Sequence, residues 1–167
     1  MIKLCTRDIS AVTESEYSLL LSHLPENLRE HVEKKKNFAD RVRSATGYTL
    51  VLEEACGEII FSENGKPYFK DIPLYFSISH SGDFVIAAFS EREVGADIEK
   101  IREIPRGVAE RFFTKREQKC DFFDIWTKKE ACGKCIGDMA EAFAKDVTGL
   151  SFYTERLGEY VIAVYEE

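Results

Sequence analysis

Two carboxylates in a short apolar segment are the first residues whose spacing could do chemistry. Residues 94–100 read VGADIEK, with Asp97 and Glu99 two positions apart. Side chains alternate between the two faces of a strand, so these carboxylates point to the same side and repel each other. Solvation or pairing with lysines would relieve the repulsion, and so would a hard cation such as Mg²⁺, which takes oxygen ligands. The spacing leaves both readings open.

A second group of candidate residues lies in WTKKEACGK, residues 126–134. At helical spacing, Trp126, Glu130 and Lys134 occupy successive i, i+4 positions on one face. Glu130 followed by Lys134 is an ordinary stabilising pair in its favoured orientation. The same two residues would also provide a third carboxylate for a cation and an ammonium group for a phosphate oxygen. The motif alone does not separate these interpretations.

Hydroxyl and imidazole groups gather in FSISHSGDF, residues 76–84, where a strand is expected to run into a turn. His80, flanked by Ser79 and Ser81, could be a structural hydrogen-bonding group or part of a phosphate site. The GKP sequence at 65–67 is primarily a turn signal. Lys66 is considered a ligand only because the other candidate residues accompany it.

The charge of the chain restricts its partners. The net charge of −7 argues against a general nucleic-acid binder, which would carry a basic surplus. Positive charge is concentrated in EKKKNFADRVR (33–43) and TKREQK (114–119), which are either solvated helix faces or sites for an anion.

The surrounding sequence predicts an α+β protein. Residues 2–6 form a strand, TESE at 13–16 is a capping box that starts a short helix, and Pro25 opens one long amphipathic helix that reaches about residue 55. Closely spaced apolar segments separated by turns follow and favour antiparallel hairpins. Helical sequence returns in IPRGVAERFF, TKREQKCDFF and IWTKKEACGKC, and the chain ends in two strands joined at LGE.

Bulk composition is that of an ordinary globular chain, with 167 residues of which 44% are hydrophobic. No apolar stretch is long enough to cross a bilayer, and the charged start MIKLCTRDIS is unlike a signal peptide, so we expect a cytoplasmic protein. Five cysteines without a signal peptide predict reduced thiols. Cys132 and Cys135 form a CxxC without a second ligand pair, so a zinc site is disfavoured.

The order of these motifs resembles that of the Sfp-type 4'-phosphopantetheinyl transferases. The resemblance covers roughly residues 36–135, and it is carried by GKP (65–67), FSISHS (76–81), GADIE (95–99), RFF (111–113) and WTKKEACGK (126–134). It implies the 4'-phosphopantetheinyl transferase fold, two similar α+β halves that each contain a small antiparallel sheet and a long helix. We place the halves at 1–93 and 94–167, and two halves in one chain predict a monomer.

The resemblance also implies an activity: transfer of the 4'-phosphopantetheine arm from coenzyme A to a serine of an apo carrier protein, with release of 3',5'-ADP. Mg²⁺ is the implied metal, with Mn²⁺ as the alternative. The carrier could serve fatty-acid, polyketide or nonribosomal peptide synthesis, and the basic TKREQK segment could meet an acidic carrier face.

Carried over by position, the resemblance assigns roles to individual residues. Asp97, Glu99 and Glu130 become the metal carboxylates, and Glu130 is also the general base. Lys134 steadies the diphosphate, and His80 joins Glu130 and Lys134 as a catalytic residue. The coenzyme A site takes in Ser79 and His80 at the phosphates, Gly65, Lys66 and Pro67 on the adenine side, and Arg43 and Ser44 near the 3'-phosphate.

The chain departs from the family pattern at two places. Ser77 stands where relatives have asparagine, and CIGDMAEAF follows where many have a Gly-Lys-Gly-like loop. The alternative function is therefore a non-catalytic protein of the same fold that binds coenzyme A or a carrier. A Mg²⁺-dependent phosphohydrolase is a third reading.

Overall fold

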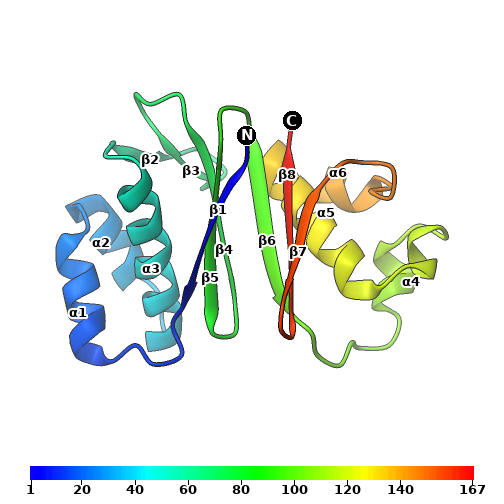
Figure 1. Ribbon diagram of the computed structural model, residues 1–167, viewed down its shortest axis with the longest axis horizontal. Coiled ribbons are helices and arrows are strands. Elements are labelled where there is room, and N and C mark those ends of the chain that lie inside the picture. The colour runs from blue at the N-terminus through cyan, green and yellow to red at the C-terminus, as the bar shows by residue number, and fades with distance from the viewer.

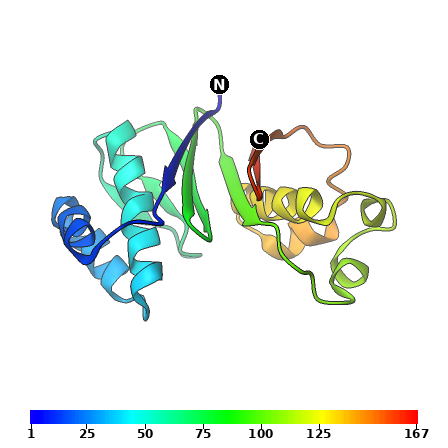
Figure 2. The same cartoon turned by 60° about the horizontal axis from the view of Figure 1, so that its bottom comes forward.

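Two three-stranded antiparallel sheets lie at the centre of the molecule, with helices on the outer side of each (Figure 1). In the computed structural model, which describes residues 1–167, the first sheet has the order β1-β5-β4 and the second the order β6-β8-β7. Figure 2 shows the same succession of helices, strands, strands and helices from a second direction. The predicted α+β class with small antiparallel sheets is confirmed.

The first sheet and its helices come from the N-terminal part of the chain. The elements are β1 (Lys3–Asp8), α1 (Glu14–His23), α2 (Glu26–Glu33), α3 (Phe38–Glu54), β2 (Ile59–Phe61), β3 (Pro67–Phe69), β4 (Tyr75–Ser81) and β5 (Phe84–Ser90). β2 and β3 form a separate hairpin. α3 packs against β4 and β5, and α1 and α2 pack against α3. The core residues include Leu28, Val51, Phe76 and Phe89.

The helix starts follow their capping residues. Thr13 and Glu16 form the predicted capping box at the start of α1. The single helix predicted from Pro25 to about residue 55 is wrong, because the chain forms α2 and α3 with a break at residues 34–37. Asn37 begins the second helix, since its side-chain oxygen accepts a hydrogen bond from the Asp40 amide at 2.8 Å.

The second sheet and its helices follow. The elements are β6 (Val94–Lys100), α4 (Val108–Phe112), the 3₁₀ helix η1 (Glu117–Lys119), α5 (Phe122–Ile136), α6 (Met139–Ala144), β7 (Tyr153–Leu157) and β8 (Tyr160–Glu166). Trp126 on α5 packs against Phe112, Phe122 and Phe143. The sequence did not predict α6. It starts directly after Gly137, whose positive φ of 75° ends α5.

An apolar layer joins the two sheets. Ile86 and Ala88 of β5 belong to the same buried cluster as Ile98 of β6 and Ile162 of β8. The division of the chain into halves at residue 93 stays a prediction, because this shared layer ties the two sheets together.

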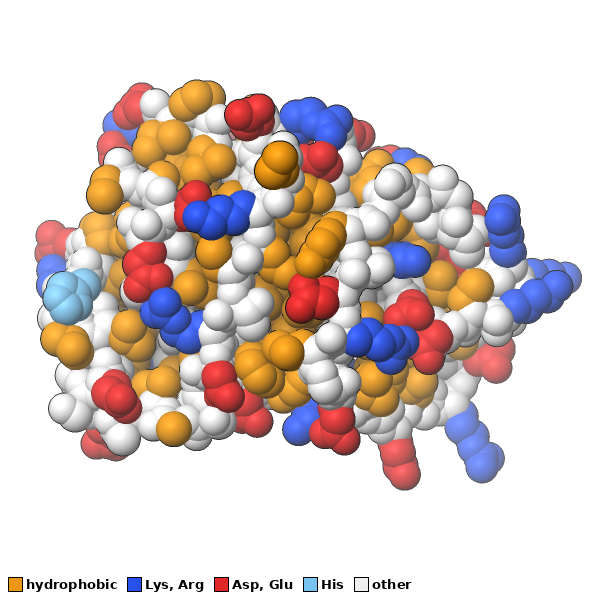
Figure 3. Space-filling view, in the orientation of Figure 1, with side chains coloured by type: hydrophobic (Ala, Val, Ile, Leu, Met, Phe, Trp, Pro, Cys, Tyr) orange, Lys and Arg blue, Asp and Glu red, His pale blue; other side chains and the backbone are white.

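The surface viewed in Figure 3 mixes acidic and basic side chains, with hydrophobic groups showing between them along the middle of the molecule. None of the helices combines the length and the apolar character that a bilayer-spanning helix needs.

Candidate active site

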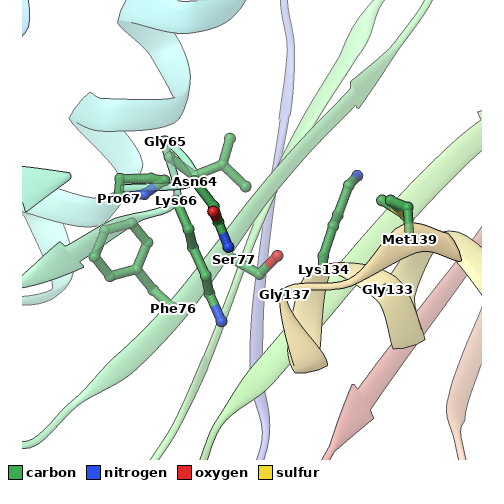
Figure 4. Close-up of a pocket in the computed structure, with 11 residues that line it drawn as sticks. Asn64, Gly65, Lys66, Pro67, Phe76, Ser77, Gly133, Lys134, Gly137 and Met139 are labelled. Atoms are coloured by element: carbon green, nitrogen blue, oxygen red, sulfur yellow. The ribbon is translucent and has the colours of Figure 1, made fainter. Parts of the chain in front are cut away.

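Two adjoining cavities lie along β4. The first, here the hairpin cavity, has a volume of about 280 Å³ and lies between the β2–β3 hairpin and β4 on one side and α5 and the start of α6 on the other. Figure 4 shows these residues facing one another across it. The second, here the histidine cavity, has a volume of about 430 Å³ and is lined by α2, α3 and β4. Pro67 and Ile78 line both, so the cavities adjoin, and together they are here called the cleft.

The hairpin cavity contains four residues that the sequence had singled out: Gly65, Lys66, Pro67 and Lys134. Gly65 has a φ of +79°, which the tight turn before Lys66 requires. The Lys66 ammonium donates to Glu93 at 2.7 Å and to the Cys135 carbonyl at 3.3 Å. Lys66 therefore links the hairpin to the C-terminal end of α5.

The histidine cavity holds Ser44 and His80, as predicted, and also residues that sequence reasoning missed: His31, Lys35, Asp40 and Tyr48. Lys35 and Asp40 lie within the basic segment 33–43 noted above, and the i, i+4 spacing of His31 and Lys35 was the available signal for the histidine. Arg43 lies beside this cavity rather than in its wall. It donates to the Gly82 carbonyl at 3.0 Å and pairs with Asp40 at 3.0 Å.

Both histidines of this cavity have a lowered pKa, which favours the neutral imidazole. The pKa of His80 is lowered, first by the partial loss of solvent around its ring and then by the charges of Arg43 and Lys134, although the residue as a whole remains exposed. His31 stacks on Phe61 with the ring centroids 4.7 Å apart, and burial lowers its pKa. A bound anion would reverse both effects by stabilising the imidazolium form.

Asp97 is the most enclosed of the three predicted carboxylates, with 4% of the residue exposed. Its Oδ1 atom accepts hydrogen bonds from the Ser79 hydroxyl at 2.7 Å and the Lys134 ammonium at 2.6 Å. Burial nevertheless raises the pKa of Asp97, and the opposing effects of Lys134 and Ser79 do not offset it.

The other two carboxylates are more accessible. Glu99 pairs with Arg102 at 2.7 Å and accepts a long hydrogen bond from Ser81 at 3.4 Å. Glu130 is half-buried on α5, and its pKa is raised, first by burial and then by the negative charge of Asp97. Asp97, Glu99, Glu130 and Lys134 are here called the charged cluster, because the pKa of Glu130 responds to the charges of the other three and that of Asp97 to Lys134 and Glu99.

The charged cluster is not a ready-made metal site. No three carboxylate, histidine or cysteine side chains of the protein are grouped as ligands. Two observations nevertheless fit a cation. The Asp97 Oδ2 atom is buried without a hydrogen-bond partner, and the Glu130 carboxylate makes no ion pair. Unpaired carboxylate oxygens are the ligands that Mg²⁺ takes, so these residues suit it chemically.

Close packing of α5 on β6 brings the charged cluster together. A β-carbon on Gly95 would overlap the Ala131 carbonyl oxygen and the Cys135 amide nitrogen of α5. Because glycine has no β-carbon, the helix backbone comes close to the strand. Asp97 and Lys134 thereby meet from two different elements.

A buried ion pair holds the middle of α5 in place. Lys129 and Glu117 are both fully buried, and their charged atoms are 3.0 Å apart. Lys129 also donates to the Phe143 and Lys145 carbonyls, and Glu117 accepts from the Thr114 and Val147 amides. The sequence had given Lys129 no role, although it lies next to Glu130 in the motif. Its side chain anchors the helix that carries Glu130.

Comparison with known proteins agrees with this arrangement. The profile of the 4'-phosphopantetheinyl transferase superfamily matches residues 93–167. The chain is 39% identical over 127 residues to the 4'-phosphopantetheinyl transferase psf-1 of Bacillus pumilus, which covers 67% of this chain and 50% of the relative. It is 35% identical to gsp of Aneurinibacillus migulanus over 141 residues, covering 72% of this chain and 59% of the relative.

A third relative is covered more completely. The chain is 36% identical over 140 residues to the 4'-phosphopantetheinyl transferase AcpT of Escherichia coli K12, and the match covers 74% of this chain and 70% of AcpT. Matches to psf-1 and gsp, by contrast, span about half to three fifths of those relatives. On the identity and coverage of the AcpT match, the chain belongs to the 4'-phosphopantetheinyl transferase superfamily.

Proposed function

We propose that the protein transfers the 4'-phosphopantetheine arm of coenzyme A to a serine hydroxyl of an apo acyl or peptidyl carrier protein. The serine oxygen forms a bond to the phosphorus that bears the pantetheine. The bond from that phosphorus to the bridging oxygen breaks, and 3',5'-ADP leaves. The charged cluster, whose Lys134 lines the hairpin cavity, is the observation that carries this proposal, because phosphoryl transfer needs charge neutralisation more than covalent chemistry.

Two residues of the charged cluster have distinct tasks. Glu130 accepts the serine proton, directly or through water, and its raised pKa brings the carboxylate closer to the working pH of a general base. Lys134 is the only cation of the cluster, and it offsets the charge that develops on the leaving phosphate. Both lie on one face of α5, so they would act on the same diphosphate.

The remainder of coenzyme A would occupy the cleft formed by the two adjoining cavities. His80, a catalytic residue in this proposal, would hold the diphosphate. Arg43 and Ser44 would hold the 3'-phosphate, and Gly65, Lys66 and Pro67 the adenine side. The Lys66 ammonium has a third donor free for a ligand, and its exposed ion pair with Glu93 is of small strength.

A divalent cation, Mg²⁺ or Mn²⁺, would be held by Asp97, Glu99 and Glu130. When bound it would neutralise diphosphate charge and relieve the repulsion between the carboxylates. Glu99 would have to exchange its contact with Arg102 for this role.

The carrier protein would approach the exposed basic residues that follow α4. Lys115 and Arg116 make no ion pair and could meet an acidic carrier face. Charge reversal at both positions should weaken carrier binding more than coenzyme A binding. Equal loss of both affinities would count against this assignment. Because one chain supplies both sides of the cleft, the proposal includes a monomeric enzyme.

The second candidate function is binding of coenzyme A or a carrier protein without catalysis. The position of Lys134 favours it, since the ammonium already neutralises Asp97 and the three carboxylates are not grouped as ligands.

The intact mass of apo carrier proteins, after incubation with this protein, coenzyme A and Mg²⁺, separates the two. A mass gain equal to the phosphopantetheine arm, absent with EDTA, is the expected result. Fatty-acid, polyketide and peptidyl carriers should all be tried, because the carrier is unknown. Glu130→Gln should abolish the gain while leaving coenzyme A binding largely intact. No gain on any carrier, with coenzyme A bound, would favour the binding protein, and coenzyme A breakdown without a carrier would indicate a phosphohydrolase.

A further inference from the structure

Three serines on one strand connect the two sheets. Ser77, Ser79 and Ser81 alternate along β4 and therefore point to the same face. Each hydroxyl accepts a hydrogen bond from a backbone amide of β6: Ala96 to Ser77 at 3.0 Å, Ile98 to Ser79 at 3.4 Å, and Lys100 to Ser81 at 3.0 Å. We call this arrangement the serine ladder. It keeps β4 and β6 in one register.

Two rungs of the serine ladder continue to the carboxylates. The Ser79 hydroxyl donates to Asp97 at 2.7 Å, and the Ser81 hydroxyl donates to Glu99 at 3.4 Å. Ser77 makes no contact with a carboxylate. Ser79 therefore makes a short hydrogen bond to a carboxylate, and Ser77 makes none.

The hydrogen-bonding capacity of Ser79 is fully used. A serine hydroxyl has one proton to donate and two lone pairs that accept. Ser79 donates to Asp97 and accepts from Ile98 and from the Lys134 ammonium at 2.9 Å. The residue is buried and lines neither cavity of the cleft. A phosphate could reach this hydroxyl only by displacing one of these partners.

Ser79 thereby makes the two oxygens of Asp97 unequal. Oδ1 holds both Ser79 and Lys134, whereas Oδ2 is buried without any partner. An unpaired buried carboxylate oxygen is costly unless something else binds it. With Oδ1 occupied, Oδ2 is the atom left for a cation.

We propose that Ser79 is a positioning residue that fixes Asp97 through Oδ1 and so presents Oδ2 to a divalent cation. This inference rests on the proposed function only in assuming that a cation binds at the charged cluster. It replaces the role at a phosphate that the family resemblance implied for Ser79, and it gives the other two serines different tasks. Ser81 supports Glu99 weakly, and Ser77, which also lines the hairpin cavity, bonds to β6 but contacts no carboxylate.

The test compares Ser79→Ala with Ser77→Ala as the matched control. Both variants lose one ladder bond to β6, but only Ser79→Ala also removes a hydrogen bond from Asp97, which leaves Lys134 as the single partner of Oδ1. Mn²⁺ affinity of the protein without substrate is measured from the electron paramagnetic resonance signal of free Mn²⁺, and the unfolding midpoint is measured alongside. Residues that orient a metal ligand typically contribute 10- to 100-fold to metal affinity. We expect roughly tenfold weaker Mn²⁺ binding for Ser79→Ala, and a change within about twofold for Ser77→Ala, at similar losses of stability.

Ser79→Cys is the second variant, in case Ser79→Ala does not fold. It keeps a side chain of similar shape with a weaker donor, so an intermediate loss of Mn²⁺ affinity is expected. Equal Mn²⁺ affinities for the Ser77 and Ser79 variants would overturn the inference, as would a wild-type protein that binds no Mn²⁺. Failure of the proposed function would look different: Mn²⁺ would bind with the expected difference between variants, but no carrier would gain mass.

Discussion

Gly95 of β6 lies directly beneath Ala131 of α5, with no room for a side chain between the strand and the helix. A β-carbon at Gly95 would overlap the Ala131 carbonyl oxygen and would also come within 3.0 Å of the Cys135 α-carbon. These are backbone atoms, which cannot move aside without displacing the helix. We expect Gly95→Ala to lower the free energy of unfolding by about 1–3 kcal/mol or more, as overpacking does.

The loss of function in Gly95→Ala should be larger than the loss of stability alone explains, because displacement of α5 separates Lys134 and Glu130 from β6. Gly149→Ala is the control, since nothing lies within 4 Å of a β-carbon there. Denaturant unfolding and Mn²⁺ binding of both variants check the prediction. A Gly95→Ala variant with unchanged stability and Mn²⁺ affinity would contradict the close packing.

The raised pKa of Asp97 predicts how acid affects the metal-free protein. Since the pKa in the folded state lies above that in the unfolded state, the folded state binds the proton more readily. The destabilisation due to Asp97 is therefore present at neutral pH and fades as the pH falls through the folded-state pKa. Asp97→Asn removes this dependence.

Denaturant unfolding at several pH values from 7 to 4, without metal, measures the effect of Asp97. The stability of the wild type relative to Asp97→Asn should rise as the pH falls. A relative stability that is flat or declining would show that Lys134 and Ser79 outweigh burial at Asp97. Comparison of the two proteins is needed because other carboxyl groups, such as Asp40, have lowered pKa values and act in the opposite direction.

His80 predicts a pH dependence of coenzyme A binding. Its lowered pKa makes the free imidazole neutral near pH 7, and a bound phosphate would favour the protonated form. Proton uptake should accompany binding, so coenzyme A should bind more tightly as the pH falls from 8 to 6, by at most tenfold per pH unit for one proton. Isothermal titration calorimetry in buffers of different ionisation enthalpy measures that uptake.

The matched variant for this effect is His80→Gln, which should take up less proton than the wild type. Ionisation of coenzyme A itself is common to both proteins and cancels. Identical proton uptake would exclude His80 as the responsible group and direct attention to His31 in the same cavity.

The Lys129–Glu117 pair predicts a stability effect at a distance from the cleft. Lys129→Met leaves the Glu117 carboxylate buried without its counter-charge, which typically destabilises a protein by about 3–5 kcal/mol. Thermal or denaturant unfolding measures this loss. Lys119→Met, at an exposed lysine, should change the free energy of unfolding by no more than about 0.5 kcal/mol.

The double variant Lys129→Met, Glu117→Gln provides the internal check. It removes both charges, so it should recover part of the stability that Lys129→Met loses. A double variant that is less stable than Lys129→Met would show that the amide bonds accepted by Glu117, and not the ion pair, dominate.

Local patterns in the sequence predicted local structure well. The capping box at Thr13 and the short apolar segments of β4, β5 and β6 that end in turns concern neighbours in the chain, and these elements are confirmed. The break at residues 34–37 was missed because the apolar spacing continues through it, while the polar contact of Asn37 with the Asp40 amide decides the new helix start.

The sequence motifs predicted which residues belong to the site, but not which of them contact one another. The sequence named Asp97, Glu130 and Lys134, but it could not reveal that Lys134 would pair with Asp97 rather than with Glu130, four positions away. Alternation of Ser77, Ser79 and Ser81 is visible in the sequence as well. That β6 would lie opposite them depends on tertiary packing across 19 residues of chain separation, which no local pattern encodes.

The serine ladder has one more consequence, for association between molecules. β6 is the terminal strand of its sheet, and the outward N–H groups of a terminal strand ordinarily invite pairing with a strand from another copy, which leads to aggregation. Serine hydroxyls occupy three of those N–H groups and leave no continuous backbone for an incoming strand to join. The serines of the ladder thus also protect the edge strand β6 from pairing with neighbouring copies of the protein.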